Sequence, residues 1–486
     1  MNEQTNKNKI KRNFIWQLGI EITNMMLPLI TSPILSRRLG AESIGIYSYV
    51  YSISYYFVIV AVLGIFQYGT REIALVRDNS DKLNQKFSEL FFAQVFIGII
   101  VLGAFLFYSI FLSKYPSLFL IESISLVGSS LLLINWFFSG LEEFRLIAIK
   151  TMIIRIIGVI LIVLLVRTSA DLPMYFLIMA AEPLMGTLVY IYLARGKVKL
   201  VPVDFKATFK HLRGMILLFV PVLATYLYSS MDKVMLGKLS TMTELGFYEN
   251  ATKALIAKNL ATALSVVLVP RMSNLIGKNN NRKFDELMQK SLDAVLLLTV
   301  AFGFGTAAIS SAFSVVFWGE SFASCGPLIL IMSLTIPAYG LTYVINNQFL
   351  VPLKKEAIYI WATALGVIFN CIFNYIMIPR YAAVGASIAT LITEYLVLII
   401  ECIAIRKQLS IVACLKRSWI YVLFGFIMIF LIKRLDVFIG YSILGLLIEV
   451  IAGVLIFGCL SICYWLISGK KQYLNIILGV FKKQNL

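Results

Sequence analysis

The sequence predicts an all-α integral membrane protein of about fourteen transmembrane helices, with two pseudo-symmetric six-helix lobes and two extra C-terminal helices. Three observations predict this class. The 486 residues are 60% hydrophobic and 14% charged, whereas soluble chains are close to half apolar and a quarter charged. Apolar stretches of about 20 residues, long enough to cross a bilayer, recur along the chain. Two similar charged hairpins, about two hundred residues apart, indicate an internal duplication.

The polar connections between apolar stretches define the order of the spans. The linker at 195–214 separates the lobes, so we predict an N-lobe at 1–205, a C-lobe at 206–408, and two further spans with a tail at 409–486. The basic N-terminus runs into a long apolar stretch, which indicates a retained first span rather than a cleaved signal. Spans are expected near 13–36, 44–67, 89–112, 117–138, 147–166, 173–194, 215–236, 247–269, 289–311, 324–346, 357–379, 383–405, 418–435 and 441–466.

Basic residues predict the orientation of these spans. Of the 43 Lys and Arg residues, 31 fall in segments on the side of the N-terminus and 8 fall on the other side. Because cytoplasmic loops are enriched in Lys and Arg, both termini are predicted to be cytoplasmic. The same distribution explains most of the net charge of +18. No nucleic-acid partner is predicted, since the basic residues form no continuous domain.

The sequence lacks the signatures of the common enzyme classes. It has no GxxxxGK[ST], HExxH or GxSxG motif, and its predicted outer loops are all short. The six cysteines have no framework spacing, and the single histidine, His211, lies in a linker predicted to be a basic loop on the inner membrane surface. We therefore predict no enzyme, no metal site and no cofactor, and transport is the leading interpretation.

The two hairpins resemble each other in detail. The stretch LSRRLGAESIGIYSY at 35–49 matches part of 229–258, and Gly45 aligns with Gly246 when one residue is inserted in the later copy. The charge distribution places both turns on the outer side. We therefore expect the hairpins to be the two halves of a duplicated outer gate.

Ionisable residues inside spans are costly unless they face water or a partner. Glu21 and Asn24 share one face of the first span, where Glu21 either loads a proton or cation, or makes a structural hydrogen bond. Asp232 and Lys233 close the seventh span, and as adjacent residues they cannot pair with each other. Near an interface Lys233 could instead snorkel to the surface. Glu394, among apolar residues of the twelfth span, is expected to be neutral or paired.

Further cations lie within the spans. Lys253 and Lys258 are expected on one helix, about 140° apart around its axis, and Arg155 lies part of the way along the fifth span. Ammonium and guanidinium groups bind phosphate through charge-assisted hydrogen bonds. These three side chains, together with Asn24 and Lys233, are therefore candidates to bind a phosphate-bearing substrate. Whether Lys253 or Lys258 meets the phosphate is left open.

Four segments carry a resemblance to a known family. They are LSRRLGAESIGIYSY with LGIFQYGTREIA at 63–74, MDKVMLGKLSTMTELGFY, INNQFLVPLKKE at 345–356 and NCIFNYIMIPRYAAVGASIAT at 370–390. In this order they resemble the polysaccharide flippases of the Wzx type, which belong to the multidrug/oligosaccharidyl-lipid/polysaccharide exporter superfamily. The resemblance covers residues 13–405 and implies two six-helix lobes around a central cavity in a bacterial plasma membrane.

The resemblance also implies a function. Such flippases move undecaprenyl-pyrophosphate-linked repeat units from the inner to the outer leaflet for capsule or O-antigen synthesis, by alternating access driven by protons or sodium. The implied partners are the lipid-linked oligosaccharide, membrane lipid and a polysaccharide polymerase. A related lipid II flippase has a basic residue early in its eighth helix, which Lys253 matches. The expected ion-coupling residues are Glu21, Asp232 and Glu394, and the expected gate residues are Arg37, Arg38 and Arg71.

Two alternatives remain open at this stage. A drug/cation antiporter of the same fold should have an acidic and aromatic cavity, and the basic residues inside the spans argue against it. A membrane polysaccharide polymerase or ligase would usually have a large external loop, and none is predicted here.

Overall fold

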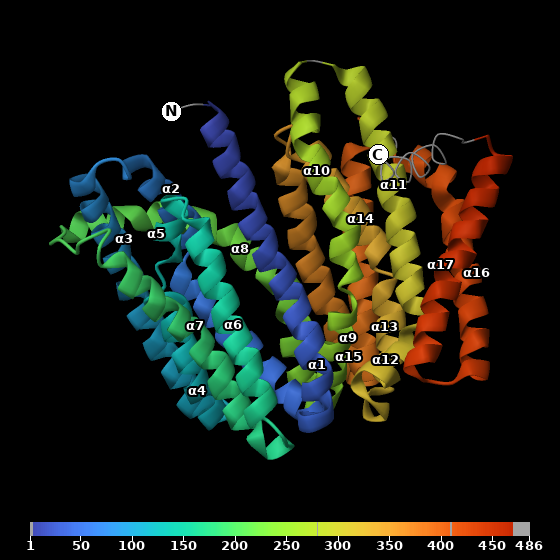
Figure 1. The fold of residues 1–486 in the computed structure, drawn as a ribbon, viewed down its shortest axis with the longest axis horizontal. Coiled ribbons are helices and arrows are strands. Elements are labelled where there is room, and N and C mark those ends of the chain that lie inside the picture. Colours follow the sequence, from blue (N-terminus) through green and yellow to red (C-terminus); the bar gives the residue numbers. More distant parts are fainter. Residues whose placement is uncertain (1–2, 279, 409–410, 470–486) are drawn as a thin grey trace. The chain divides into compact units, whose positions relative to one another are not determined.

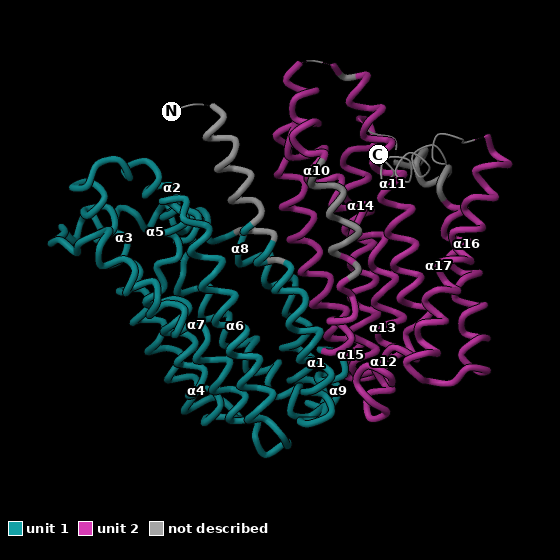
Figure 2. Tube along the Cα trace, viewed as in Figure 1, with its two compact units in different colours: residues 1–249 teal, residues 250–486 magenta. Residues whose placement is uncertain are grey.

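The structure is a computed structural model that describes residues 3–278, 280–408 and 411–469, without the side chains of 3–15, 17–18, 21, 221, 257, 259–267, 281 and 411–418. Every regular element in these ranges is helical (Figure 1), which confirms the predicted all-α class. The helices form two compact units, residues 1–249 and 250–486 (Figure 2). A compact unit is not a sequence repeat, so the predicted lobe boundary at 205/206 stays a prediction.

The first unit is built from long apolar helices and short connections. Its helices are α1 (Glu3–Val62), α2 (Ile65–Val76), α3 (Ser80–Phe107), α4 (Pro116–Leu126), α5 (Asn135–Gly140), α6 (Phe144–Leu165), α7 (Leu172–Ala194), α8 (Phe205–Leu239) and the first part of α9 (Met242–Ala254). Two π-helical turns, at Tyr108–Leu112 and Val127–Leu131, continue α3 and α4.

The second unit begins within α9 and is also built from apolar helices with short connections. Its other helices are α10 (Ala257–Gly277), α11 (Asn281–Ala308), α12 (Ser310–Trp318), α13 (Cys325–Ser333), α14 (Ile336–Val344), α15 (Glu356–Ile405), α16 (Ile411–Ile439) and α17 (Ile443–Ile467). A π-helical segment at Ile345–Leu350 follows α14.

Two long helices are each a pair of helices joined at a kink. In α1 the kink is at Gly40, whose φ of 77° suits a residue without a Cβ atom. In α15 it is at Ala382, where φ is 48°. Among the described residues nine helical segments are long and apolar enough to cross a membrane, or ten when one helix bent by 44° is included. Because two of these segments contain a kink, the structure is compatible with fourteen spans.

Each unit has its own apolar core. In the first unit the side chains of Trp136, Phe137 and Phe138 on α5 are fully buried against Phe87 on α3. The Trp136 indole N–H donates a 2.9 Å hydrogen bond to Gln94, which satisfies both buried polar groups. In the second unit, α11 carries a buried stripe that packs against α14 and α16. Many outward Ile, Leu and Phe side chains are exposed, as expected for a multi-pass membrane protein whose solvent is lipid.

The linker between the predicted lobes is partly helical, so the prediction that His211 lies in a basic loop is wrong. Asp204 caps the start of α8 by accepting a hydrogen bond from the backbone N–H of Lys206. His211 is 6% exposed and lies between Tyr68 on α2 and Glu89 on α3. Its Nδ1 is 2.8 Å from the Tyr68 hydroxyl and its Nε2 is 3.0 Å from the Glu89 carboxylate. These contacts fasten the start of α8 to the neighbouring helices.

Candidate functional site

The first group of candidate residues surrounds Arg155, in the interior of α6. Its Nε lies 3.3 Å from the carboxylate of Glu182 on α7, and its Nη1 donates a hydrogen bond to the side-chain oxygen of Asn24 on α1. About a third of the Arg155 side chain remains exposed. The guanidinium is therefore held in position by three helices while part of it stays accessible. The structure brings together Arg155 and Asn24, two of the candidate residues, and their roles in substrate binding stay predictions.

The second group surrounds Lys258, in the first turn of α10. Its ammonium lies 3.5 Å from the carboxylate of Glu394 on α15 and 3.5 Å from the ring centre of Tyr339 on α14. A carboxylate and an aromatic face both stabilise a cation that is partly removed from water. The Lys258 side chain is 25% exposed, whereas that of Glu394 is 7% exposed. The expectation that Glu394 is neutral or paired is thus met by pairing.

The predicted eighth span is not one continuous helix. α9 ends at Ala254 and α10 begins at Ala257, so the expected 140° relation between Lys253 and Lys258 is wrong. The Lys253 ammonium donates a 3.2 Å hydrogen bond to the side chain of Asn250, one turn earlier in α9. The break gives the two lysines different local environments, and the Lys258 ammonium contacts the buried Glu394 carboxylate.

Asp232 and Lys233, near the end of α8, have different partners, as the helix geometry predicts. The Tyr248 hydroxyl donates a 2.8 Å hydrogen bond to the Asp232 carboxylate. The Lys233 ammonium is 2.7 Å from the Glu249 carboxylate, which also accepts a hydrogen bond from Ser48. Lys233 is therefore tied to a carboxylate, and the snorkelling interpretation is not needed.

The two hairpins meet at their aligned glycines. A Cβ atom on Gly45 would lie 1.7 Å from the carbonyl oxygen of Met242, and one on Gly246 would lie 1.8 Å from that of Ala41. Ala41 and Met242 are themselves aligned by the same insertion. The contact is thus reciprocal, as the predicted duplication requires, while the role of the hairpins as an outer gate stays a prediction. Only glycine permits backbones to approach this closely.

We predict that Gly45→Val destabilises the protein strongly. The added side chain has to displace a backbone carbonyl, so the cost should reach or exceed the roughly 1–3 kcal/mol typical of overpacking. Thermal unfolding of the purified protein in detergent measures the loss. Gly103→Val is the matched control, because no atom lies within 4 Å of a Cβ at that position. Equal unfolding temperatures for the two variants would contradict the tight packing of the hairpins.

The arginines predicted as gate residues occupy different settings. Arg38 donates from Nη1 to the carbonyls of Val163 and Val166, at 2.6 and 2.7 Å, and so caps the C-terminus of α6. Arg71 on α2 is exposed, pairs with Glu72 at 3.4 Å and lies over the Tyr68 ring. Arg37 is also exposed. Their roles in gating stay predictions, as does ion coupling by Glu21, whose side chain is outside the described residues.

A row of tyrosines follows the second half of α1. Tyr47, Tyr51 and Tyr55 are four residues apart, and their successive ring centres are 5.7 Å apart in stacked pairs. Tyr175 on α7 and Tyr226 on α8 flank the row at 4.6 and 4.7 Å. The sequence interpretation missed this row, although the i, i+4 spacing of tyrosines in YSYVYSISYY is visible.

Comparisons with known proteins find similarity to proteins of polysaccharide biosynthesis and glycan transport. A profile of the family described as "Polysaccharide biosynthesis protein" matches residues 10–276. A protein of Escherichia coli (strain K12) described as an O-antigen transporter is 22% identical over 83% of this chain and 98% of its own length. One of Haloferax volcanii described as a low-salt glycan biosynthesis flippase is 25% identical over 49% of this chain and 51% of its own.

Solved structures show the same fold. The lipid II flippase MurJ in an inward closed conformation matches with a TM-score of 0.72 and 18% identity, over 93% of this chain and 99% of that one. An inward-facing multidrug resistance transporter of the MATE family matches with a TM-score of 0.58 and 13% identity, over 86% and 99%. At these identities the matches show the fold alone.

Proposed function

Because the chain belongs to the polysaccharide biosynthesis protein family, we propose that it is a flippase that carries lipid-linked oligosaccharides between the leaflets of its membrane. The relatives described above are a transporter and a flippase of glycans, which supports this function. Neither is described as an enzyme, so the proposal includes no enzymatic step.

One structural observation carries the proposal. Each unit contains a cation within an apolar helix bundle that is paired with a carboxylate, Arg155 with Glu182 and Lys258 with Glu394. Both cations are partly exposed, so neither pair is sealed. Charged residues inside spans are rare, and a partly exposed one is by default a candidate for a substrate or ion pathway. A phosphate group is a suitable ligand, because it offers several charged oxygen acceptors to ammonium and guanidinium groups.

The pairs suggest how the phosphate is bound and released. When the substrate is absent, each carboxylate keeps its cation neutralised and positioned. An arriving phosphate competes with the carboxylate for the same N–H donors, and the displaced carboxylate then has to take up a proton or be reached by water so that its charge is compensated. The reverse exchange favours release. In this way the charged group avoids the prohibitive transfer through bare hydrocarbon.

The tyrosine row suits the glycan part of the substrate. Pyranose rings have an apolar face of C–H groups that packs against aromatic rings, and tyrosine hydroxyls add hydrogen bonds at the edge. Tyr47, Tyr51 and Tyr55 present such rings at a regular spacing along α1. Repeated similar surfaces would let a sugar chain move in steps.

The finer parts of the proposal rest on the resemblance of the sequence to the Wzx-type flippases and on its charge distribution. The substrate is an undecaprenyl-pyrophosphate-linked repeat unit of a capsule or O-antigen-type polysaccharide, moved from the inner to the outer leaflet of a bacterial plasma membrane by alternating access. Both termini are cytoplasmic. A proton or sodium gradient drives the step through Glu21, Asp232 and Glu394, and a polysaccharide polymerase uses the product on the outer side.

A reconstituted assay tests the function. Liposomes with the purified protein and a fluorescently labelled lipid-linked oligosaccharide should bring the label to the outer leaflet faster than liposomes without protein. A pH or sodium gradient in separate arms identifies the coupling ion. An organic cation as alternative substrate tests the antiporter function. Translocation of that cation without translocation of the glycolipid would overturn the proposal.

A further inference from the structure

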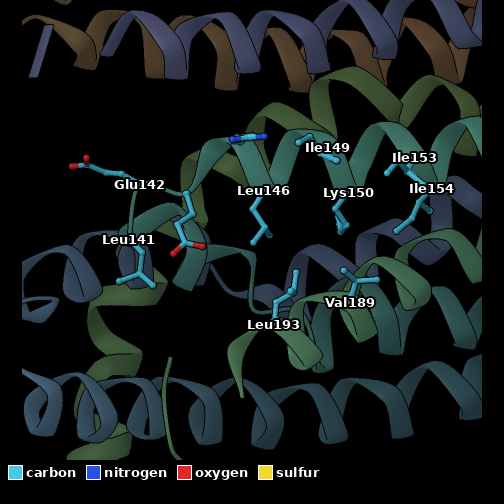
Figure 3. Close-up of a pocket in the computed structure, with 11 residues that line it drawn as sticks. Leu141, Glu142, Leu146, Ile149, Lys150, Ile153, Ile154, Val189 and Leu193 are labelled. Atoms are coloured by element: carbon cyan, nitrogen blue, oxygen red, sulfur yellow. The ribbon is translucent and has the colours of Figure 1, made fainter. Parts of the chain in front are cut away.

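A groove of about 710 Å³ lies between α6 and α7 (Figure 3). Leu146, Lys150 and Ile154 are one helical turn apart on α6 and point toward Val189 and Leu193 on α7. The walls at this level are apolar apart from the Lys150 ammonium. A cation in an apolar groove has to be compensated, because its desolvation is costly.

The surroundings of Lys150 leave room for an added anion to contact its ammonium. Its ammonium lies 4.0 Å from the ring centre of Tyr190, and a Cβ on Gly186 would come within 2.8 Å of it, so glycine leaves it room. Among the residues that the structure describes, no carboxylate makes an ion pair with Lys150. The nearest helix offers Glu182, and that carboxylate is held by Arg155.

The acidic residues at the mouth of the groove are neutralised by other partners. Glu142 accepts a 2.7 Å hydrogen bond from Arg77, and this bond raises the pKa of the Arg77 guanidinium above its usual range. Glu143 is paired with Lys197 at 2.5 Å. Arg145, exposed at the same mouth, has no carboxylate partner in the described part of the chain.

The groove consequently carries an excess of positive charge. In the described part of the chain neither Arg145 nor Lys150 makes an ion pair, although Glu182 attracts the Lys150 ammonium at longer range. Arg145 also lies in the first turn of α6, where the helix dipole favours an anion. The groove therefore complements an anionic group near the end of the helix.

An apolar surface continues from the groove along α6. Ile149, Ile153, Ile156, Ile157 and Ile160 follow the i, i+4, i+7, i+8, i+11 spacing of one helix face. Each of them is between 36 and 52% exposed. In a membrane this face contacts hydrocarbon chains. The anion-binding groove and the hydrocarbon-binding face are thus continuous on one helix.

We propose that this groove is a binding site for an anionic phospholipid of the adjacent leaflet, with its phosphate on Arg145 and Lys150 and an acyl chain along the isoleucine face. The volume suits part of one lipid. A lipid-linked oligosaccharide fits less well, because the lining acids Glu142 and Glu143, which could accept hydrogen bonds from sugar hydroxyls, are already paired with Arg77 and Lys197. This site is independent of the proposed function, since it concerns a lipid that stays bound rather than one that is moved.

A lipid titration tests the site. The unfolding temperature of the full-length protein in detergent is measured against increasing phosphatidylglycerol or phosphatidylcholine. Phosphatidylglycerol should stabilise the protein more strongly. Lys150→Met and Arg145→Met should each require about fivefold more phosphatidylglycerol for half of the effect, in line with the loss of one cation at a membrane surface. Lys150→Arg should behave like the wild type.

Control variants distinguish binding in this groove from nonspecific attraction of the anionic lipid to surface charges. Lys82→Met removes an exposed charge from the same unit and should leave the titration unchanged. Overlapping curves for Lys150→Met, Arg145→Met and the wild type would overturn the proposal, as would equal stabilisation by phosphatidylcholine or by soluble glycerol phosphate. Undecaprenyl phosphate forms a further arm. If it displaces phosphatidylglycerol and loses more affinity in Lys150→Met, the carrier lipid occupies the groove and the proposal is wrong.

Discussion

Lys258→Ala is expected to slow glycolipid translocation by about 10- to 100-fold, which corresponds to roughly 1.4–2.8 kcal/mol of lost interaction with the phosphate. The ammonium is the donor in the contact with Glu394, and alanine leaves no group that could bind the phosphate in its place. The rate of label appearance in the outer leaflet of liposomes measures the effect, at equal amounts of reconstituted protein. Lys278→Ala, at the exposed residue that follows the last turn of α10, is the matched control.

Removal of Lys258 also leaves the Glu394 carboxylate buried without its ion partner, which could unfold the protein instead of disabling it. The double variant Lys258→Ala with Glu394→Gln separates these effects. It removes the charge of both partners, so stability should recover while translocation stays slow. Normal translocation by the double variant would show that Lys258 serves the fold and not the substrate.

The membrane spans were predictable because the lipid environment permits few backbone conformations and few side-chain types. A chain in hydrocarbon has to satisfy its backbone hydrogen bonds internally and present apolar side chains, so each crossing requires a long apolar helix. The windows near 147–166 and 173–194, for example, match α6 and α7 within a few residues. The break between Ala254 and Ala257 was not predictable in the same way. No glycine or proline occurs between Asn250 and Leu260, so no local signal marks it.

The sequence predicted which charged residues belong to the candidate site, but it did not predict which residues they pair with. The cost of a charge in a span singled out Arg155 and Lys258, whereas their pairing with Glu182 and Glu394 depends on which helices are neighbours. The aligned hairpin sequences did predict the equivalence of Gly45 and Gly246, because an internal duplication preserves its geometry in both copies.

Lys150, in contrast, was not singled out by the sequence as a candidate binding residue. From the sequence alone, Lys150 counts among the 31 basic residues on the side of the N-terminus, and in the structure it lies six residues after the start of α6. Its importance comes from the groove formed with α7, from the space left by Gly186 and from the pairing of nearby acids elsewhere. None of these is a property of the local sequence. The structure was therefore needed to distinguish this lysine from the many that only define orientation.

Arg155→Ala is expected to impair translocation as strongly as Lys258→Ala, by about 10- to 100-fold. The guanidinium bonds a carboxylate through Nε and an amide oxygen through Nη1, so its fork is oriented by α7 and α1 at once. Lysine has a single ammonium and cannot reproduce both contacts. Arg155→Lys should therefore restore only part of the rate, although it keeps the charge. The liposome assay that serves for Lys258 measures both variants.

Asn24 provides the test of whether this orientation matters. Asn24→Ala removes one of the two groups that hold the guanidinium and leaves both charges of the Arg155–Glu182 pair in place. If Arg155 has to be aimed at the phosphate, the rate should fall by several-fold with little change in unfolding temperature, as expected for the loss of one hydrogen bond of about 1 kcal/mol. If Arg155 acts only as a positive charge, Asn24→Ala should translocate at the wild-type rate while Arg155→Lys is fully active. The two substitutions thus decide between directional recognition of phosphate and simple charge neutralisation.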